Sequence, residues 1–271
     1  MIDPHSFREF EHTGWENIPR HYHRAFGDLT SQTIEALLDA AAVKKNTKVI
    51  DIATGPGYVA AAAAKRGAAV VGVDFSSAMV AEAQRSYPDI EFREGDAEQL
   101  PFGNGLFDAA VMNFGILHLA RPEQALVEAQ RVLRTGGKFA FTAWAKPEET
   151  VGFGIVLRAI GLHGDLNVRL PEGPPFFRFS DPDECARSLV VAGFESPKVT
   201  KVAQIWRLPA ADGLFEAMKE STVRTAGLLR EQKPEALIRI REAIRKETEA
   251  YQKGDVIELP MPAILASGTK I

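Results

Sequence analysis

The alternation of strand-like and helix-like segments between residues 47 and 145 most constrains the fold. Short runs of β-branched and apolar residues recur there at 48–52, 69–73, 90–93, 107–113 and 138–144. Longer stretches with helical periodicity separate them. Several runs are apolar on both faces, as strands buried in a parallel sheet are. The pattern therefore predicts an α/β fold with a parallel sheet and crossover helices.

The rest of the chain predicts helices and irregular segments around this core. The first thirty residues show no clear period, and an amphipathic helix is expected over 29–43. The later segments are a helix over 151–162, a proline-rich stretch around Gly173, a helix ending at Gly193, a strand over 199–208, a helical region over 212–252 broken near Pro234, and an apolar run over 256–266. We expect one α/β core with a helical cover rather than two independent domains.

Composition excludes several classes of protein. The chain is 45% hydrophobic, as globular proteins are, and its net charge of −4 without a basic block argues against a nucleic-acid partner. The apolar runs are too short for a membrane span, and no secretory signal is visible. We therefore expect a soluble, cytoplasmic protein. A single cysteine, Cys185, excludes an internal disulfide framework and is expected to be a buried, inert thiol.

A glycine turn joins the first predicted strand to the next helix. Residues 49–57 read Val-Ile-Asp-Ile-Ala-Thr-Gly-Pro-Gly. Gly55 and Gly57 let a ligand approach the backbone, and the helix N-terminus behind them offers free N–H groups. The same residues also fit the G-x-G-x-x-G/A pattern of dinucleotide sites, and glycine pairs occur in simple tight turns. The turn alone leaves these alternatives open.

An acidic residue, Asp74, ends the second predicted strand. The first two strands of such a sheet lie side by side, so this carboxylate is placed to accept hydrogen bonds from both hydroxyls of a ribose. An adenosine ligand fits, whether it belongs to NAD or to S-adenosylmethionine. The alternative is a strand-end carboxylate that caps the following helix.

Further motifs follow in order: Gly95-Asp96-Ala97 with Leu100-Pro101-Phe102, then Phe107-Asp108, and then Arg-Val-Leu-Arg-Thr-Gly-Gly at 131–137. With Asp51, the glycine turn and Asp74, this series resembles the class I S-adenosylmethionine-dependent methyltransferases. It is most similar to the type 11, small-molecule branch that includes the ubiquinone-biosynthesis C-methyltransferases. The resemblance covers residues 29–207. It implies a Rossmann-like, seven-stranded sheet with its last strand antiparallel, for which residues 256–266 are the candidate.

The resemblance also implies how S-adenosylmethionine is held, with S-adenosylhomocysteine as the product. Asp51, Gly55 and Gly57 would hold the methionine moiety, with Thr54 in the same turn. The other implied contacts are Asp74 at the ribose, Phe75 and Met79 against the adenine, Asp96 and the Ala97 N–H at the adenine edge, the Asn113 backbone carbonyl at the methionine amine, and Tyr22 as a lid tyrosine. Thr135 stands where the family usually has proline, in a turn without a functional role.

The regions outside these motifs are expected to cover a substrate. We predict a lid segment over residues 1–30 and a methyltransferase domain over 31–271, whose insertions 146–180 and 210–253 roof an acceptor pocket. The aromatic stretch at 174–179 suggests an apolar substrate wall, although such residues are as readily part of the core. A small, partly apolar acceptor and a monomer or homodimer are expected.

Methyl transfer needs alignment and exclusion of water more than a catalytic group. His118 follows the fourth strand and is the candidate general base, or else a wall of the pocket. His21 and His23 are alternatives if the N-terminal segment folds over the cofactor, and no metal site is expected because they lack partners at ligand spacing. Arg224 is expected to be an exposed helical arginine, with the alternative that it anchors a substrate carboxylate or phosphate together with Thr222 and Thr225.

The sequence thus predicts S-adenosylmethionine-dependent methyl transfer to a small acceptor by in-line displacement. Two alternatives stay open. An NAD(P)-dependent oxidoreductase is supported only by the glycine turn and Asp74, and no Tyr-x-x-x-Lys pair is present. A non-catalytic protein that binds S-adenosylmethionine is compatible with the sequence, since methyl transfer requires no obligatory catalytic residue.

Overall fold

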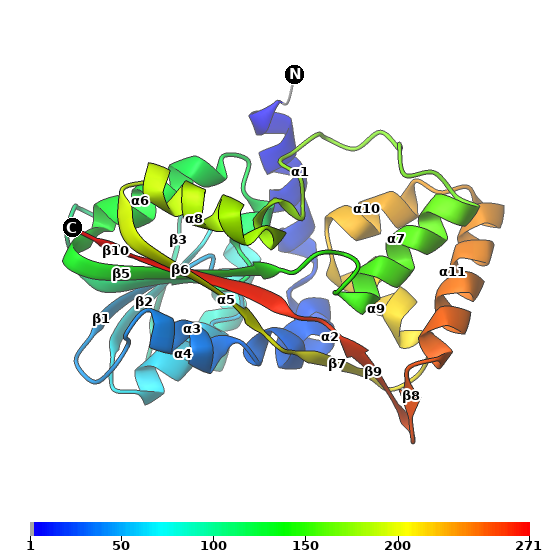
Figure 1. Cartoon of the computed structure of the whole chain (residues 1–271), viewed down its shortest axis with the longest axis horizontal. Helices are drawn as coiled ribbons and strands as arrows, with labels where there is room; N and C mark the ends of the chain where they lie inside the picture. Colours follow the sequence, from blue (N-terminus) through cyan, green and yellow to red (C-terminus); the bar gives the residue numbers. More distant parts are fainter. Residues whose placement is uncertain (1–2) are drawn as a thin grey trace.

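A seven-stranded sheet forms the centre of the molecule in a computed structural model that describes residues 3–271 (Figure 1). The strand order is β3-β2-β1-β4-β5-β10-β6. The bounds are β1 Lys48–Ile52, β2 Ala69–Asp74, β3 Glu91–Glu94, β4 Phe107–Met112, β5 Leu133–Trp144, β6 Phe194–Val202 and β10 Ala263–Lys270. The first five strands are parallel, and β10 runs antiparallel to both β5 and β6. The predicted fold class is confirmed.

The two C-terminal strand predictions were wrong in their bounds. The run 256–266 divides into β9 (Val256–Pro260) and β10, and the segment 199–208 divides between β6 and β7 (Ile205–Leu208). The strands β7, β9 and β8 (Gln252–Lys253) form a second, three-stranded sheet. The two runs are interrupted at residues that face each other, Gln204 and Met261. Met261 N donates to Gln204 O, and Gln204 Nε2 donates to Met261 O. One continuous apolar run therefore contributes strands to two different sheets, and periodicity alone does not show where the run divides.

Helices cover both faces of the main sheet. Figure 1 shows α6 (Pro122–Val132) and α8 (Pro182–Val191) on one face, and α3 (Ile34–Ala40) and α4 (Tyr58–Lys65) on the other. Ser76 caps α5 (Ser77–Ser86) by accepting a hydrogen bond from Met79 N. Buried aliphatic side chains fill both layers, so the parallel strands are apolar on both sides as predicted.

The remaining helices form a separate cover beside the carboxyl edge of the sheet (Figure 1). They are α1 (Pro4–Asn17), α2 (Pro19–Ser31), α7 (Val151–His163), α9 (Gly213–Ser221), α10 (Arg224–Arg230) and α11 (Pro234–Glu249), with the short 3₁₀ turns η1 (Ile116–His118) and η2 (Arg178–Ser180). Residues 4–17 and 19–31 are helical although this part of the sequence lacks a clear period, and the helix expected over 29–43 is interrupted between Ser31 and Ile34. None of the helices in residues 3–271 has the length and apolar character to cross a membrane.

Candidate active site

The glycine turn between β1 and α4 keeps the backbone open to a cavity. Gly55 and Gly57 have positive φ angles of 52° and 87°. A Cβ atom added at Gly55 would meet no described atom within 4 Å, whereas one at Gly57 would lie 2.8 Å from Cζ of Phe92. Gly55 therefore leaves room for a ligand beside the backbone, while Gly57 is required by packing.

Asp51, at the end of β1, places a buried carboxylate on the cavity wall. Its Oδ2 accepts hydrogen bonds from Thr54 Oγ1 at 2.5 Å and Ala60 N at 3.0 Å. Its Oδ1 is buried and has no hydrogen-bond partner within residues 3–271. Burial raises the pKa of Asp51 to about 7 in spite of these hydrogen bonds. A ligand cation would satisfy the free oxygen and stabilise the ionised carboxylate.

Asp74 occupies the corresponding position at the end of β2. Its Oδ2 accepts from Gly55 N at 2.8 Å and its Oδ1 accepts from Ser76 N at 3.0 Å. Burial raises the pKa of Asp74 to about 6, and these two backbone hydrogen bonds oppose the shift. The carboxylate thus joins the two turns after β1 and β2, and it also lines the cavity. Each oxygen keeps acceptor capacity for ligand hydroxyls.

The residues assigned to the adenine line the same cavity. They are Phe75, Met79, Asp96 and Ala97. Phe75 meets the ring of His12 edge-on at 5.3 Å, and Asp96 forms an ion pair of 2.8 Å with Arg8. Both partners belong to α1, so the N-terminal helix lies against this end of the cavity.

Asn113 follows β4 and ties the sheet to the first helices. Its Oδ1 accepts from Thr33 Oγ1 at 2.8 Å and from Thr142 Oγ1 at 2.6 Å. Its Nδ2 donates to Thr30 O at 3.0 Å. The side-chain oxygen is therefore engaged in the scaffold, and the backbone together with one N–H of Nδ2 is left to contact a ligand.

The cavity lies at the carboxyl edge of the sheet and has a volume of about 1220 Å³, including its opening to solvent. One part contains the glycine turn with Asp51 and Asp74. The other part is lined by aromatic side chains, namely Trp15, Tyr22, Phe26, Phe114, Trp144, Phe153 and Phe176. Ligand pockets are lined mainly by apolar groups with a few placed polar groups. The cavity can therefore hold a nucleoside-like group and a second, apolar molecule.

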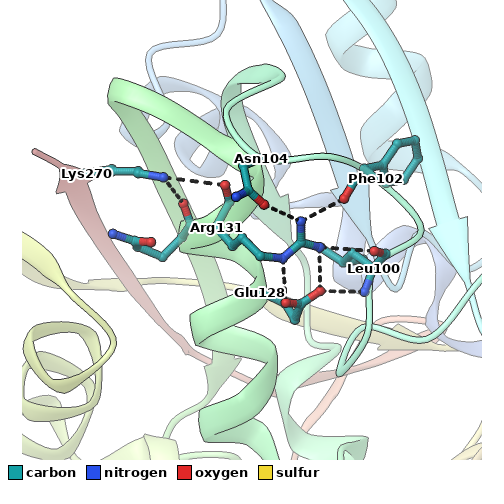
Figure 2. A network of polar contacts seen from close by, with 7 residues as sticks. Leu100, Phe102, Asn104, Glu128, Arg131 and Lys270 are labelled. Carbon is teal, nitrogen blue, oxygen red and sulfur yellow. Dashed lines mark hydrogen bonds and ion pairs between the residues drawn. The ribbon is translucent and has the colours of Figure 1, made fainter.

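A network around Arg131 fixes the loop that begins beside the cavity (Figure 2). From α6, its guanidinium donates to Leu100 O at 3.1 Å, to Phe102 O at 2.7 Å and to both oxygens of Glu128 at 2.7 Å. Glu128 Oε2 also accepts from Leu100 N at 2.8 Å. The hydrogen bonds from Arg131 hold the pKa of Glu128 below its ordinary value, despite partial burial. The motif at 131–137 thus stabilises the Leu-Pro-Phe motif at 100–102.

Two comparisons identify the family of the chain. A family model described as "Methyltransferase domain" matches residues 50–141. The ubiquinone/menaquinone biosynthesis C-methyltransferase UbiE of Roseobacter denitrificans is 32% identical over 184 residues, which are 60% of this chain and 72% of that protein. The chain belongs to the class I S-adenosylmethionine-dependent methyltransferases. The resemblance seen in the sequence is confirmed.

Other relatives of the chain match over shorter parts of their length. The demethylmenaquinone methyltransferase of Beutenbergia cavernae is 35% identical over 165 residues, which are 56% of this chain and 65% of that protein. Its counterpart from Paenarthrobacter aurescens is 39% identical over 111 residues, which are 41% of this chain and 44% of that protein. The chain thus spans less than two thirds of these relatives.

Solved structures agree on the fold of the chain. Phosphoethanolamine N-methyltransferase 2 of Haemonchus contortus, solved with phosphomonomethylethanolamine and S-adenosylhomocysteine, aligns with a TM-score of 0.61 at 18% identity. The alignment covers 98% of this chain and 60% of that one. The YcgJ protein of Bacillus subtilis aligns with a TM-score of 0.57 at 20% identity, over 88% and 97% of the two chains. At these identities the likeness concerns the fold alone.

Only one member of the His21-Tyr22-His23 segment lines the cavity. Tyr22 stacks on Phe26 with ring centroids 5.7 Å apart. His21 Nδ1 lies 3.2 Å from Glu220 Oε2, and His23 Nδ1 lies 2.5 Å from the Tyr58 hydroxyl. The two histidines therefore lie outside the residues that line the cavity.

Glu11, which sequence reasoning missed, lies behind the aromatic part of the methyltransferase cavity. It is completely buried, and its carboxylate contacts both His118 and Arg224. The expectation that Arg224 is exposed was wrong, because its side chain is only 17% exposed and donates to Glu11, Leu117 O and Pro174 O. No periodic pattern marked Glu11, and its partners are 107 and 213 residues away in the chain.

Proposed function

We propose that the chain binds S-adenosylmethionine at the glycine turn and catalyses transfer of its methyl group to a small, partly apolar acceptor by in-line displacement. The observation that carries this proposal is the continuity of the cavity. The glycine turn, with its two buried carboxylates, lines the same cavity as the aromatic side chains named above. We call the part lined by these aromatic side chains the aromatic compartment. A donor and an acceptor can therefore meet inside one enclosed space.

The residues at the glycine turn fit the cofactor in charge and shape. The free Oδ1 of Asp51 suits the ammonium of the methionine moiety, and the open side of Gly55 admits its chain. Asp74 suits the ribose hydroxyls. Phe75, Met79, Asp96 and Ala97 are proposed to hold the adenine, the backbone of Asn113 the amine, and Tyr22 to cover the site.

When bound, S-adenosylmethionine supplies a methyl group that its sulfonium has already activated, and S-adenosylhomocysteine remains as the product. The task of the protein is to align the acceptor and to exclude water. The rings of Trp144, Phe153 and Phe176 offer flat apolar walls for this alignment. His118 is the proposed base if the acceptor has to lose a proton.

The polar groups of the aromatic compartment favour a neutral acceptor. Among the described residues that line the cavity, Arg224 is the only lysine or arginine. Its guanidinium is occupied by Glu11 and by two backbone carbonyls, so it offers little to a phosphate or a carboxylate. The relatives named above act on demethylmenaquinone or in quinone biosynthesis, and an aromatic acceptor of that kind fits these walls. The cytoplasmic location, the absence of a nucleic-acid partner and the monomeric or homodimeric state stay predictions.

Thermal unfolding with separate ligands tests the proposal. A ligand at about 100 times its Kd adds roughly 2.7 kcal/mol to the stability of the folded state. We expect S-adenosylmethionine and S-adenosylhomocysteine to stabilise the protein, whereas NADH and NADPH do not. Stabilisation by a nicotinamide alone would instead support the oxidoreductase alternative.

A screen of phenols and hydroquinones then separates an enzyme from a protein that only binds the cofactor. The screen then extends to amines and carboxylates and uses mass spectrometry to detect a product heavier by one methylene, with the Gly55→Val variant as the control. Cofactor binding without a methylated product across aromatic, amine and carboxylate acceptors would favour the non-catalytic alternative.

A further inference from the structure

The buried carboxylate of Glu11 is surrounded by three hydrogen-bond donors. Its Oε1 accepts from Arg224 Nε at 2.8 Å, and its Oε2 lies 2.9 Å from His118 Nδ1 and 3.1 Å from Trp15 Nε1. A fully buried charge is costly unless such partners compensate it. Burial by itself would raise the pKa of Glu11, but its hydrogen bonds to His118 and Arg224 hold it below its ordinary value. Glu11 is therefore ionised.

An ionised carboxylate fixes which nitrogen of His118 carries a hydrogen. A carboxylate can only accept, so the neutral imidazole must carry its hydrogen on Nδ1 and leave the lone pair on Nε2. His118 lines the cavity, and its Nε2 makes no hydrogen bond to any described residue. The rings of Trp15 and Phe176 meet the imidazole edge-on at 4.7 and 6.0 Å and fix its plane.

Arg224 holds Glu11 in place without competing for the imidazole. Its two terminal nitrogens donate to Pro174 O at 2.7 Å and Leu117 O at 2.9 Å. The guanidinium also lies over the Phe7 ring, 4.4 Å from its centroid. These contacts join α1, the turn that contains His118, the loop before η2 and α10. The position of the carboxylate is thus determined from several sides.

We propose that Glu11 is a positioning residue that holds His118 with its hydrogen on Nδ1, so that Nε2 accepts a proton from a hydroxyl group of the acceptor. The inference rests on the proposed function and specifies its acceptor as a neutral aromatic molecule with a hydroxyl, such as a phenol or a hydroquinone. The proton passes from the hydroxyl to Nε2, and the electron pair of the O–H bond stays on the acceptor oxygen. The imidazolium, stabilised by Glu11, later returns the proton to water.

Because Glu11 belongs to α1, the oriented base exists only when this helix is docked on the cavity. A second carboxylate of α1, Glu16, docks the same helix elsewhere. It accepts from Ser77 Oγ at 3.1 Å, and within residues 3–271 it forms no hydrogen bond or ion pair with His118. Glu16→Gln is therefore a matched control. It weakens the docking of α1 without touching the imidazole.

Nitrogen NMR of ¹⁵N-histidine-labelled protein, recorded without any ligand, reads the hydrogen position directly. His118 is assigned from the signal that disappears in His118→Gln. In the unsubstituted protein we expect the hydrogen on Nδ1. In Glu11→Gln, Arg224 and the Trp15 N–H can both only donate, and the charged Arg224 is the stronger partner for the single amide oxygen. The amide NH₂ then faces Nδ1, and the hydrogen moves to Nε2. Glu16→Gln should leave the hydrogen on Nδ1.

If Glu11→Gln fails to fold because Arg224 is left without its charge partner, the double variant Glu11→Met/Arg224→Met removes both charges together. We expect that variant to lose the preference for the hydrogen on Nδ1. A hydrogen on Nε2 in the unsubstituted protein, or one that stays on Nδ1 after Glu11 is replaced, would overturn the proposal.

Steady-state kinetics with a phenolic or hydroquinone acceptor provide a second test of the role of Glu11. Glu11→Gln should lower kcat by about 10²-fold or more with little change in the KM of the acceptor, since general base catalysis contributes 10²- to 10⁴-fold. A change in KM alone would show a merely structural role. Calorimetric binding of S-adenosylmethionine, measured in parallel, separates the two proposals: no binding would defeat the proposed function, while the NMR result still decides the role of Glu11.

Discussion

Two regions of this molecule are built in different ways. One is the cofactor side, which is the glycine turn with Asp51 and Asp74, and the other is the helical cover. On the cofactor side, the contacts of Asp51 with Thr54 and of Asp74 with Ser76 join residues two or three positions apart. In the cover, Glu11 contacts Arg224 across 213 positions. Short motifs therefore encode the first region, whereas only the folded chain assembles the second.

The difference predicts where substitutions act. A change at the glycine turn should alter cofactor binding while the fold persists, because the turn is formed locally on a stable sheet. A change in the cover should alter acceptor chemistry or the docking of helices, because its contacts hold distant segments together. Three substitutions and a change of pH test this difference between the two regions, beginning with the largest expected effect.

Gly55→Val should weaken S-adenosylmethionine binding by at least about a hundredfold, equal to roughly 2.7 kcal/mol. The valine would project into the open side of the turn, where a Cβ meets no described atom within 4 Å. Gly254→Val is the matched control, since Gly254 also has a positive φ angle and an open side but lies in the β8–β9 hairpin. Calorimetry measures both variants, and equal affinities would place the cofactor elsewhere.

Asp74→Asn should weaken cofactor binding by about ten- to a hundredfold, as expected for the loss of charge-assisted hydrogen bonds worth about 1.5–3 kcal/mol. The control is Asp108→Asn. Asp108 lies in β4, pairs with Arg134 and does not line the cavity. If both variants bind the cofactor like the unsubstituted protein, the carboxylate of Asp74 only joins two turns.

Arg131→Lys should lower the free energy of unfolding by about 2 kcal/mol, because an ammonium cannot reproduce the forked hydrogen bonds to Glu128 and to two carbonyls (Figure 2). Arg134→Lys is the control in the same motif. The Arg134 side chain is 57% exposed, so its ion pair contributes less than about 1 kcal/mol. Urea unfolding compares them, and equal losses would contradict the role of Arg131 in fixing the loop.

The pH dependence should be the smallest effect. Burial raises the pKa of Asp51 to about 7 and that of Asp74 to about 6. The folded, unliganded protein therefore holds protons that the unfolded chain releases, and its stability falls as the pH rises from about 4 to 7. A bound ammonium favours the ionised Asp51, so the Kd of the cofactor should rise by up to about tenfold between about pH 8 and pH 6. Calorimetry at both pH values measures the change in Kd. A constant Kd would show that Asp51 does not bind the ammonium of the cofactor.

Much of the cofactor side could be predicted from the sequence. The strands around Asp51 and Asp74 were placed correctly, because buried parallel strands leave continuous apolar runs between glycine turns. The roles of the site residues stay proposals. The two C-terminal runs were not divided correctly, since the break at Gln204 and Met261 depends on a hydrogen bond between segments that are 57 residues apart.

The sequence by itself determined the parallel part of the sheet, the glycine turn and the family, because these features follow from local periodicity and from motifs of a few residues. Tertiary structure alone decided that Glu11 meets His118 and Arg224. A buried charge gains its partners only when helices from opposite ends of the chain pack together, and no local pattern records which donors it will find. Whether that cluster orients a base is therefore a question of packing, and it can be tested with substitutions at Glu11.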